Sequence, residues 1–462
     1  MVLPLKLVVF ERYMLADNRQ HVPMAFQIRL IFSGQLDREK FRTALKQTLA
    51  RHPLLSAHLD GEGTAMRWVA ADPNVIHFDC EPAGVPMTHA EAAEIDLRRE
   101  TGLRTWIRYD DREIDMRFQF HHSTCDGIGS YAFLDDLLRH YHALVRPDAP
   151  VEPLDIRPEL LPQRTQLGLR WWNRLIRFPI TALAVLHGGS SFLLRDPVEL
   201  AVPQREPPDD VELRRVVDMP AVLFDRATLN KLSAVAKQAR VKLNDLLTCE
   251  IIRAMVQWHE RITGRPWPGN MRVMVPMNLR TAKDAPQSAT NIVGMVPLDR
   301  TPRSLARTKG FLRVIYHEMN YFKFFRFGVE FLNVVRTFEV IFGLKVLTDK
   351  DRCRATTTFS NMGRVFFDST LPRVDGKLCS GGLTLERVES APPTRRRTTT
   401  AFTSLSYNGT LSLIMNYDRL VMTEATAREL LEHISDRIRS TAHAEATSAT
   451  ETPARTSLEP AA

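Results

Sequence analysis

The spacing of apolar residues changes abruptly around residues 121–127, and this change constrains the fold more than any other feature. Along 113–120 apolar and polar residues alternate, which is typical of a strand. Beyond residue 127 the apolar residues follow the spacing of an amphipathic helix: Phe133, Leu134, Leu137, Leu138 and Tyr141. The chain between the two reads His121-His122-Ser123-Thr124-Cys125-Asp126-Gly127. A strand therefore meets a helix at a segment that holds two histidines, an aspartate and a glycine.

The length and composition describe a globular protein with more than one unit. At 462 residues the chain exceeds one ordinary core, so we expect two large lobes or two to three domains. Its 44% hydrophobic and 25% charged residues are typical of a soluble protein. The net charge of +8 favours an anionic cofactor, an acidic carrier protein or an anionic membrane surface as partner. Nucleic acid is not expected, because the basic residues are dispersed and carry no nucleic-acid motif.

The cysteines and the N-terminus indicate a cytoplasmic protein with reduced thiols. The five cysteines are odd in number, far apart and without a CxxC pair, so neither a zinc site nor a disulfide framework is predicted. The apolar run Met1 to Phe10 is predicted to be a first strand rather than a signal peptide, because Lys6 interrupts it and no cleavage site follows. No apolar run reaches the roughly 18 residues of a membrane span.

Strands and helices are predicted in both halves of the chain. The first half has a strand at 24–33, a helix from its N-cap Asp37 to near Pro53, and a helix near 89–100. Helices of the second half are predicted at 226–238, from Asn244 to about Trp258, and at 424–439. Its strands are predicted at 272–277, 292–298, 356–367, 400–407 and 410–417. The predicted units are an N-terminal lobe (1–165), a crossover (166–210), a C-terminal lobe (211–440) and a disordered tail (441–462).

A histidine of the motif is suited to general-base catalysis. A neutral imidazole, with an ordinary pKa of about 6.5, takes a proton from a hydroxyl or amine and returns it. Counting in twos along the preceding strand places His122 in register with the apolar side chains and His121 with the polar ones. His122 is therefore the predicted base. Asp126 either contacts this ring or anchors the loop through an arginine, and Gly127 suits an unusual φ or a close approach by substrate.

Three other interpretations of the motif are open. His121, His122 and Asp126 could be metal ligands, but adjacent histidines in an extended chain point apart, so no metal is predicted. Cys125 could be a nucleophile, but it needs an activating base and has no supporting local signature. The two histidines could also be hydrogen-bonded structural residues at the end of a strand.

The motif HHxxxDG resembles the signature of the CoA-dependent acyltransferase superfamily. This superfamily includes chloramphenicol acetyltransferases, condensation domains, plant and alcohol acyltransferases, and the wax ester synthase/diacylglycerol acyltransferase group. Further segments are similar to its motifs in the expected order: 51–55, 275–280, 291–296, 360–363 and the hairpin 407–417. The resemblance covers most of residues 8–440. The plant Asp-Phe-Gly-Trp-Gly motif is absent from the sequence, and no adenylation or carrier segment is present.

The resemblance implies an α/β pseudo-dimer of two chloramphenicol-acetyltransferase-like lobes, each a mixed sheet flanked by helices. A tunnel between the lobes would admit the donor thioester from one face and the acceptor from the other. His122 would deprotonate the acceptor, which attacks the thioester without an acyl-enzyme. Asp126 would be structural and paired with Arg280. Ser360 and Asn361 would lie near the tunnel as candidate oxyanion donors.

Two segments dense in aromatic and basic residues suggest a lipid-facing surface. Residues 167–186 carry arginines at the i, i+4, i+7 spacing of one helical face, and 311–347 hold many aromatic side chains. Both are either interfacial helices or lids over an acyl channel, or helices that pack over the lobes or form a dimer contact. The run Arg395-Arg396-Arg397 either binds the CoA phosphates or is a solvated charge run.

The leading hypothesis is acyl transfer from a CoA thioester to the hydroxyl group of a hydrophobic alcohol or lipid. Acyl-CoA or an acyl carrier protein would be the co-substrate, and no tightly bound cofactor is expected. The protein is expected in the cytoplasm, with peripheral contact to a membrane. The alternatives are a stand-alone condensation enzyme that forms an amide or ester from carrier-bound acyl groups, and a non-catalytic binding protein that retains the fold.

Overall fold

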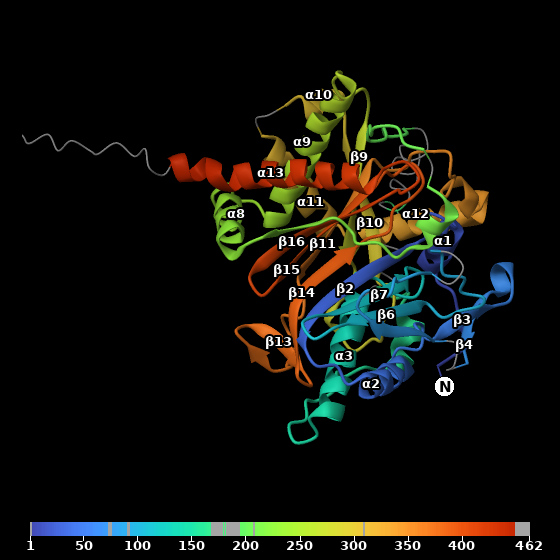
Figure 1. The fold of residues 1–462 in the computed structure, drawn as a ribbon. Coiled ribbons are helices and arrows are strands. Elements are labelled where there is room, and N and C mark those ends of the chain that lie inside the picture. The colour runs from blue at the N-terminus through green and yellow to red at the C-terminus, as the bar shows by residue number, and fades with distance from the viewer. Residues whose placement is uncertain are drawn as a thin grey trace, which may run out of the picture.

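Two large β-sheets that adjoin each other form the frame of the protein (Figure 1). The computed structural model describes residues 2–72, 76–89, 93–167, 179, 181, 195–206, 208–307 and 310–448. The first sheet has the strand order β12 (Arg373–Val374), β13 (Lys377–Ser380), β14 (Leu383–Ala391), β2 (Ala25–Gly34), β7 (Ile114–His121), β6 (Leu103–Tyr109) and β5 (His77–Pro82). The second has the order β10 (Val293–Arg300), β9 (Met271–Asn278), β11 (Thr357–Arg364), β15 (Thr400–Tyr407), β16 (Thr410–Tyr417) and β8 (Ala221–Phe224). A small third sheet contains β1 (Leu5–Lys6), β4 (Arg67–Ala70) and β3 (Ala57–Asp60).

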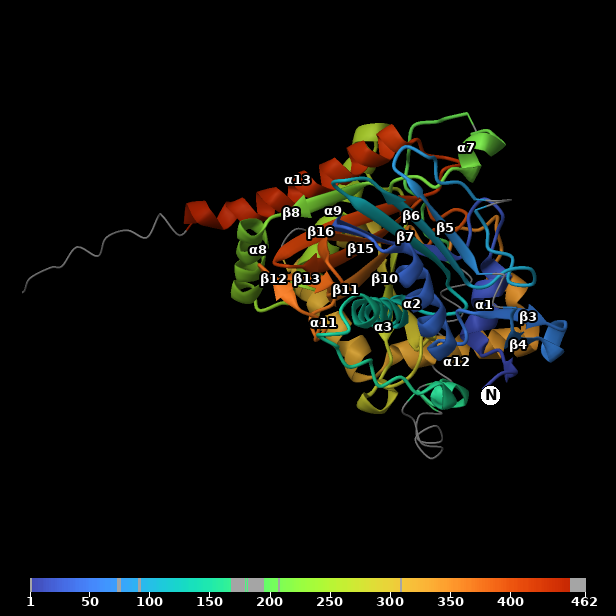
Figure 2. The ribbon, with the colours of Figure 1, turned by 60° about the horizontal axis from the view of Figure 1, so that its bottom comes forward.

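Each large sheet has its own helices and its own core. The helices α2 (Arg38–Arg51) and α3 (Gly127–Val145) pack together against the first sheet, and Figure 2 shows α3 nearly end-on below it. The second sheet packs against α8 (Arg226–Gln238), α9 (Leu243–Thr263), α11 (Phe311–Phe324) and α13 (Glu424–Ser448). A smaller core between α1 (Val9–Asp17) and α12 (Phe327–Phe342) includes residues next to β2, β9 and β10, and so joins the two halves.

Three strands from the second half of the chain complete the sheet of the first half. β14 pairs antiparallel with β2, from Leu383 opposite Gly34 to Ala391 opposite Gln27. β13 and β12 extend the same sheet beyond β14, and the chain then returns to the second sheet as β15. Residues 373–391, within the predicted C-terminal lobe at 211–440, therefore belong to the first sheet.

Both faces of the motif-bearing strand β7 are buried, although its sequence alternates. The apolar side chains face the core shared with α2 and α3. On the other face Asp115 accepts hydrogen bonds from Arg29 (2.9 Å) and Arg117 (2.7 Å), and Arg117 also pairs with Asp218 (2.5 Å). The charged side chains on this face therefore form ion pairs with one another and with Asp218, rather than hydrogen bonds with water.

Two predicted elements in the first half are wrong. Residues 9–17 form the helix α1, and only Leu5–Lys6 of the predicted first strand is a strand. The carboxylate of Glu11 accepts the backbone N–H of Val8 (2.9 Å), which satisfies a free donor at the start of this helix. Residues 93–100 form bends and turns instead of a helix, because the side chain of Asp96 accepts the N–H of Arg98 (3.0 Å) and stabilises a turn.

Two helices extend past their predicted ends. α9 begins at Leu243, because the carboxylate of Asp245 accepts the N–H of Lys242 (3.1 Å), so Asn244 is not the N-cap. Residues 441–448 continue α13 rather than being disordered, and 449–462 lie outside the described residues. The remaining predicted strands, and the helices after Asp37 and at 226–238, are confirmed within two to three residues at nearly every end.

The two segments predicted to face lipid have different outcomes. Most of the predicted helix at 167–186 lies outside the described residues. Residues 311–347 form α11 and α12, which bury Phe311 and Val335 but leave Phe324 82% exposed. In the described part of the chain no helix is long and apolar enough to cross a membrane. Contact of α11 or α12 with a membrane surface stays a prediction.

The hydroxyl group of Tyr407 on β15 bonds the first sheet. It accepts the N–H of Leu378 (2.8 Å) and donates to the carbonyl of Leu385 (2.8 Å), and the side chain is buried. We expect Tyr407→Phe to lower the free energy of unfolding by about 1–3 kcal/mol, because a buried donor and a buried acceptor lose their partner. Tyr109→Phe is the control, since that hydroxyl bonds the exposed Arg38 (2.7 Å). Equal losses for both variants in urea denaturation would contradict this role.

Candidate active site

The carboxylate of Asp126 joins the motif to the second sheet. Its Oδ1 accepts the N–H of Gly129 (2.9 Å), which caps the N-terminus of α3. Its Oδ2 accepts Nη1 of Arg280 (2.7 Å) and the N–H of Ile292 (2.8 Å). Arg280 follows β9 and Ile292 precedes β10, so one buried carboxylate binds three parts of the fold. The ion pair expected between Asp126 and Arg280 is present, and the carboxylate's hydrogen bonds go to these groups rather than to the histidine ring.

The segment 289–292 holds the backbone of the motif in place. The side-chain amide of Asn291 donates to the carbonyls of His122 (2.8 Å) and Ser123 (3.0 Å). The same segment is fixed from its other side, because Nδ1 of His52 accepts the N–H of Ala289 (2.8 Å). His52 belongs to the predicted motif at 51–55, so that motif supports the active-site loop through the second half of the chain.

The ring of His122 lies among apolar groups on the wall of a cavity of about 200 Å³, which we call the His122 cavity. Its edge contacts are with Phe10 and Phe26, whose ring centroids lie 6.0 and 5.2 Å away. Nδ1 is buried, so Nε2 is the nitrogen available to the cavity. Burial lowers the pKa of His122, and its own backbone and Asp126 partly offset this effect. The imidazole is therefore neutral at neutral pH, as a general base must be.

His121 has a different position and role. Its side chain is fully buried, and its Nδ1 accepts the N–H of Ser123 (3.1 Å) within the motif. Burial lowers the pKa of His121 to about 3, and His122 and Arg104 lower it further. His121 is therefore a neutral structural residue that shapes the turn, while His122 faces the cavity.

Cys125 and Gly127 have structural surroundings. Cys125 is fully buried in the core of the first sheet, and burial raises its thiol pKa well above the ordinary value. Gly127 begins α3 without a left-handed φ, so the unusual φ expected for it is wrong. A side chain there would meet the end of Met362, 2.6 Å from a Cβ, so the close approach comes from β11. Among the described residues no group of three His, Cys, Asp or Glu side chains could hold a metal ion.

The other predicted site residues lie on the second half. Ser360 and Asn361 of β11 line the His122 cavity. The hydroxyl of Ser360 is near the sulfur of Met362 (3.6 Å), and the Oδ1 of Asn361 accepts the N–H of Gly363 (2.7 Å). The hydroxyl of Ser360 and the amide nitrogen of Asn361 can therefore turn toward a ligand.

The three arginines at 395–397 do not form one cluster. Arg395 lines the His122 cavity and pairs with Asp17 of α1 (2.5 Å). Arg396 lies 3.8 Å from Asp418, and Arg397 pairs with Glu199 (2.8 Å). Each guanidinium has a carboxylate neighbour of its own. Contact of Arg396 or Arg397 with CoA phosphates stays a prediction.

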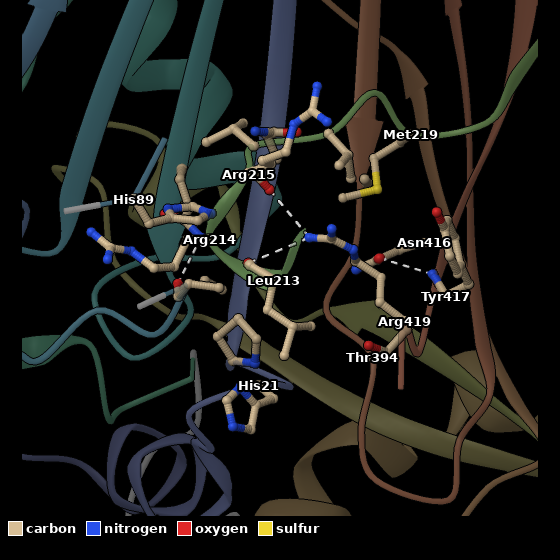
Figure 3. Close-up of a pocket in the computed structure, with 18 of the residues that line it drawn as sticks. His21, His89, Leu213, Arg214, Arg215, Met219, Thr394, Asn416, Tyr417 and Arg419 are labelled. Atoms are coloured by element: carbon tan, nitrogen blue, oxygen red, sulfur yellow. Dashed lines mark hydrogen bonds between the residues drawn. The ribbon is translucent and has the colours of Figure 1, made fainter. Parts of the chain in front are cut away.

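A second cavity, of about 260 Å³, shares Phe26 with the first and has a mixed lining of polar and apolar side chains (Figure 3). Arg419 lies at its centre and donates to the carbonyls of Leu213 (3.5 Å) and Arg215 (3.1 Å), which holds the segment 212–215 in place. His89 also lines it, but burial and Arg104 lower the pKa of His89 to about 3. His89 is therefore a poor base, and the cavity offers binding groups such as Arg419.

Several site residues were not predicted from the sequence. Phe10 and Phe26, which orient the ring of His122, looked like ordinary strand residues. Asn291 was noticed only as part of a motif, and no local signal showed that it bonds the active-site loop. Tyr13 and Asp17 had no signal, because no element was predicted between the strand expected at 1–10 and the strand at 24–33.

The chain has limited sequence similarity to known proteins. No family model matches the chain. Two uncharacterized proteins of Mycobacterium tuberculosis, from strains CDC 1551 / Oshkosh and ATCC 25618 / H37Rv, are each 23% identical over 287 residues. The match covers 60% of this chain and 62% of each relative, so it spans about three fifths of their length.

The fold is shared with solved structures over nearly the whole chain. A variant of the starter condensation domain of rhizomide synthetase, in complex with C8-CoA, has a TM-score of 0.66, 14% identity and 95% coverage of both chains. The trichothecene 15-O-acetyltransferase of Fusarium sporotrichioides has a TM-score of 0.68, 12% identity and 94% coverage of both. The epimerization domain of tyrocidine synthetase B has a TM-score of 0.62 and 12% identity, and the match covers 96% of this chain and 98% of that domain. The predicted α/β fold is confirmed, and its reaction must be argued from the site.

The ion pair of Asp126 and Arg280 should dominate the stability of the site. We expect Asp126→Ala to lower the free energy of unfolding by about 3–5 kcal/mol, because it leaves a largely buried guanidinium unpaired and two N–H groups without an acceptor. Arg280→Met in the Asp126→Ala background should recover part of this loss. Asp155→Ala, which breaks an exposed pair with Arg157, is the control and should change little. Additive effects of the two site substitutions in chemical denaturation would contradict the coupling.

Proposed function

We propose that the protein transfers an acyl group from a thioester to a hydroxyl group, with His122 as general base. The observation that carries this proposal is the position of His122, a neutral imidazole on the wall of an apolar cavity lined by residues of both sheets. The fixed backbone of the loop supports the same role, since it holds the ring in one place.

The proton transfer follows from the neutral ring. Nε2 of His122 takes the proton of the acceptor hydroxyl, and the oxygen attacks the carbonyl carbon of the thioester. The tetrahedral intermediate collapses when the C–S bond breaks, and the imidazolium returns the proton to the leaving thiolate. The enzyme ends the cycle as it began, and an ester and a free thiol are formed.

The developing oxyanion needs a hydrogen-bond donor on the cavity wall. The hydroxyl of Ser360 and the amide of Asn361 are the donors that we propose, because both line the His122 cavity. The nitrogens Nη1 and Nη2 of Arg280 bond Asp126 and the carbonyl of Thr290, so Arg280 is better suited to support than to catalysis.

The lining of the cavity favours a hydrophobic acyl chain. Methionine and aromatic side chains dominate the wall near His122: Phe10, Met14, Met24, Phe26, Met274, Met295, Phe331 and Met362. Unbranched methionines adapt to chains of different shape. Acyl-CoA is the proposed donor, in line with the C8-CoA complex and the acetyltransferase among the similar structures.

The decisive experiment measures release of free thiol from a panel of short and long acyl-CoAs with several alcohols and amines. We expect transfer to an alcohol by the wild type, and a loss of at least about a hundredfold in kcat for His122→Ala, which removes the base. Phe324→Ala, at an exposed position that does not line the His122 cavity, is the control and should retain both activity and Tm.

Near-wild-type turnover in folded His122→Ala would overturn the proposal. If the wild type accepts only acyl groups on a phosphopantetheinylated carrier protein, the enzyme is a condensation enzyme. If no donor releases thiol in the presence of any acceptor, the protein is a binding protein.

A further inference from the structure

One end of the His122 cavity carries a group of buried charges that the proposed reaction does not use. Tyr13 and Asp17 of α1 line this end, together with Arg354 and Arg395. The side chains of Asp17, Arg354 and Arg395 are 7%, 2% and 19% exposed. Buried charges need partners, so the balance of these groups shows what the cavity can bind.

Asp17 satisfies only one side of the Arg395 guanidinium. Nε and Nη2 of Arg395 contact the two carboxylate oxygens of Asp17 at 2.5 and 3.0 Å, and Nη2 also donates to the carbonyl of Leu347 (3.2 Å). Among the described residues Nη1 has no hydrogen-bond partner. Because Arg395 lines the cavity, Nη1 is the edge that a ligand can reach.

Arg354 adds a positive charge that Asp17 does not balance. Nη1 of Arg354 lies 3.7 Å from Asp196, which is 39% exposed and pairs more closely with Arg352 (2.8 Å). Burial lowers the pKa of Arg354, and the charges of Arg352 and Arg395 lower it further, although Asp196 raises it. Two largely buried guanidinium groups and one buried carboxylate therefore line this end of the cavity.

Tyr13 contributes a hydrogen-bond donor. Burial raises the pKa of its hydroxyl group, which therefore stays protonated at neutral pH. A tyrosine hydroxyl and a guanidinium edge together match the acceptor oxygens of a carboxylate.

The distance from the base follows from the helix. Phe10, which contacts the ring of His122, and Asp17 lie on the same helix α1, seven residues apart in sequence, and both line the cavity. Seven residues of an α-helix span about 10 Å. The positive end of the cavity therefore lies on the order of 10 Å from the reacting hydroxyl, with apolar side chains between.

We propose that Arg395, Tyr13 and Arg354 bind the carboxylate of the acceptor, so that the acceptor is a hydroxy acid with an apolar spacer rather than a neutral alcohol. This inference rests on the proposed function, because it names the acceptor for that reaction. The carboxylate binds Nη1 of Arg395 while its hydroxyl lies against Nε2 of His122, and the two contacts align the alcohol for attack.

The test compares a medium-chain ω-hydroxy acid with its methyl ester and with the alcohol of equal length. For the wild type we expect the KM of the hydroxy acid to be lower than that of the methyl ester or the alcohol by about tenfold or more. Charge-assisted hydrogen bonds stabilise a complex by enough for this difference. The double variant Asp17→Asn/Arg395→Gln removes both charges of the pair and leaves polar side chains in their place. It should lose this preference, so that the hydroxy acid and the neutral alcohol have similar KM values. Arg428→Gln, which breaks an exposed pair with Glu424, is the control.

Binding is measured as well as turnover. In calorimetry, His122→Ala should bind the hydroxy acid more tightly than its methyl ester. Adding Asp17→Asn/Arg395→Gln to this variant should remove the difference. If the wild type acylates the neutral alcohol and the hydroxy acid with equal KM values, the proposed function holds and this inference fails. If Asp17→Asn/Arg395→Gln raises only the KM for acyl-CoA, Arg395 binds the donor and this inference fails. If no acyl transfer occurs but calorimetry shows the charge-dependent binding, the subsite stands and the proposed reaction fails.

Discussion

The carboxylate of Asp126 is the interaction on which the geometry of the site depends. It accepts hydrogen bonds from the start of α3, from Arg280 after β9 and from the N–H of Ile292 before β10. A nearly buried carboxylate is costly unless its oxygens are satisfied, and here each is bonded. One residue of the motif therefore fixes the helix that follows it and the position of the second sheet. The bonds of Asp126 are structural contacts, and none of them goes to the ring of His122.

This joint explains why His122, the proposed base, lies where the two sheets meet. Asn291, held beside Ile292, bonds the backbone of His122 and Ser123, so the second half of the chain determines where the ring of His122 points. Walls from both sheets then enclose the ring and lower its pKa by excluding water. The same closure brings Asp17 of α1 close to Arg395, 378 residues away in sequence. Apolar walls and a polar end therefore arise from one arrangement of the two sheets.

Local patterns predicted much of the fold and which histidine lines the cavity, but not the contacts between distant segments. Alternation along β7 was enough to separate His122 from His121, because the side-chain period of a strand is two. The N-cap at Asp37 was also predictable, because its side chain bonds the N–H of Lys40, only three residues away. The exchange of β14 into the first sheet left no local signal, since strand pairing depends on distant residues. The helix α1 was missed because its N-terminus is capped by Glu11 from within, and Asp17 was missed with it.

The dependence of kcat/KM on pH tests His122 as the base most directly. Because burial lowers the pKa of His122, its neutral form persists below about pH 6.5, the ordinary imidazole value. The account predicts a constant rate through neutral pH that falls in acid with an apparent pKa below that value. Reaction through the thiolate of Cys125 would instead rise into alkaline pH, because burial raises that pKa well above the ordinary one. A rate that continues to climb above neutral pH would contradict the account.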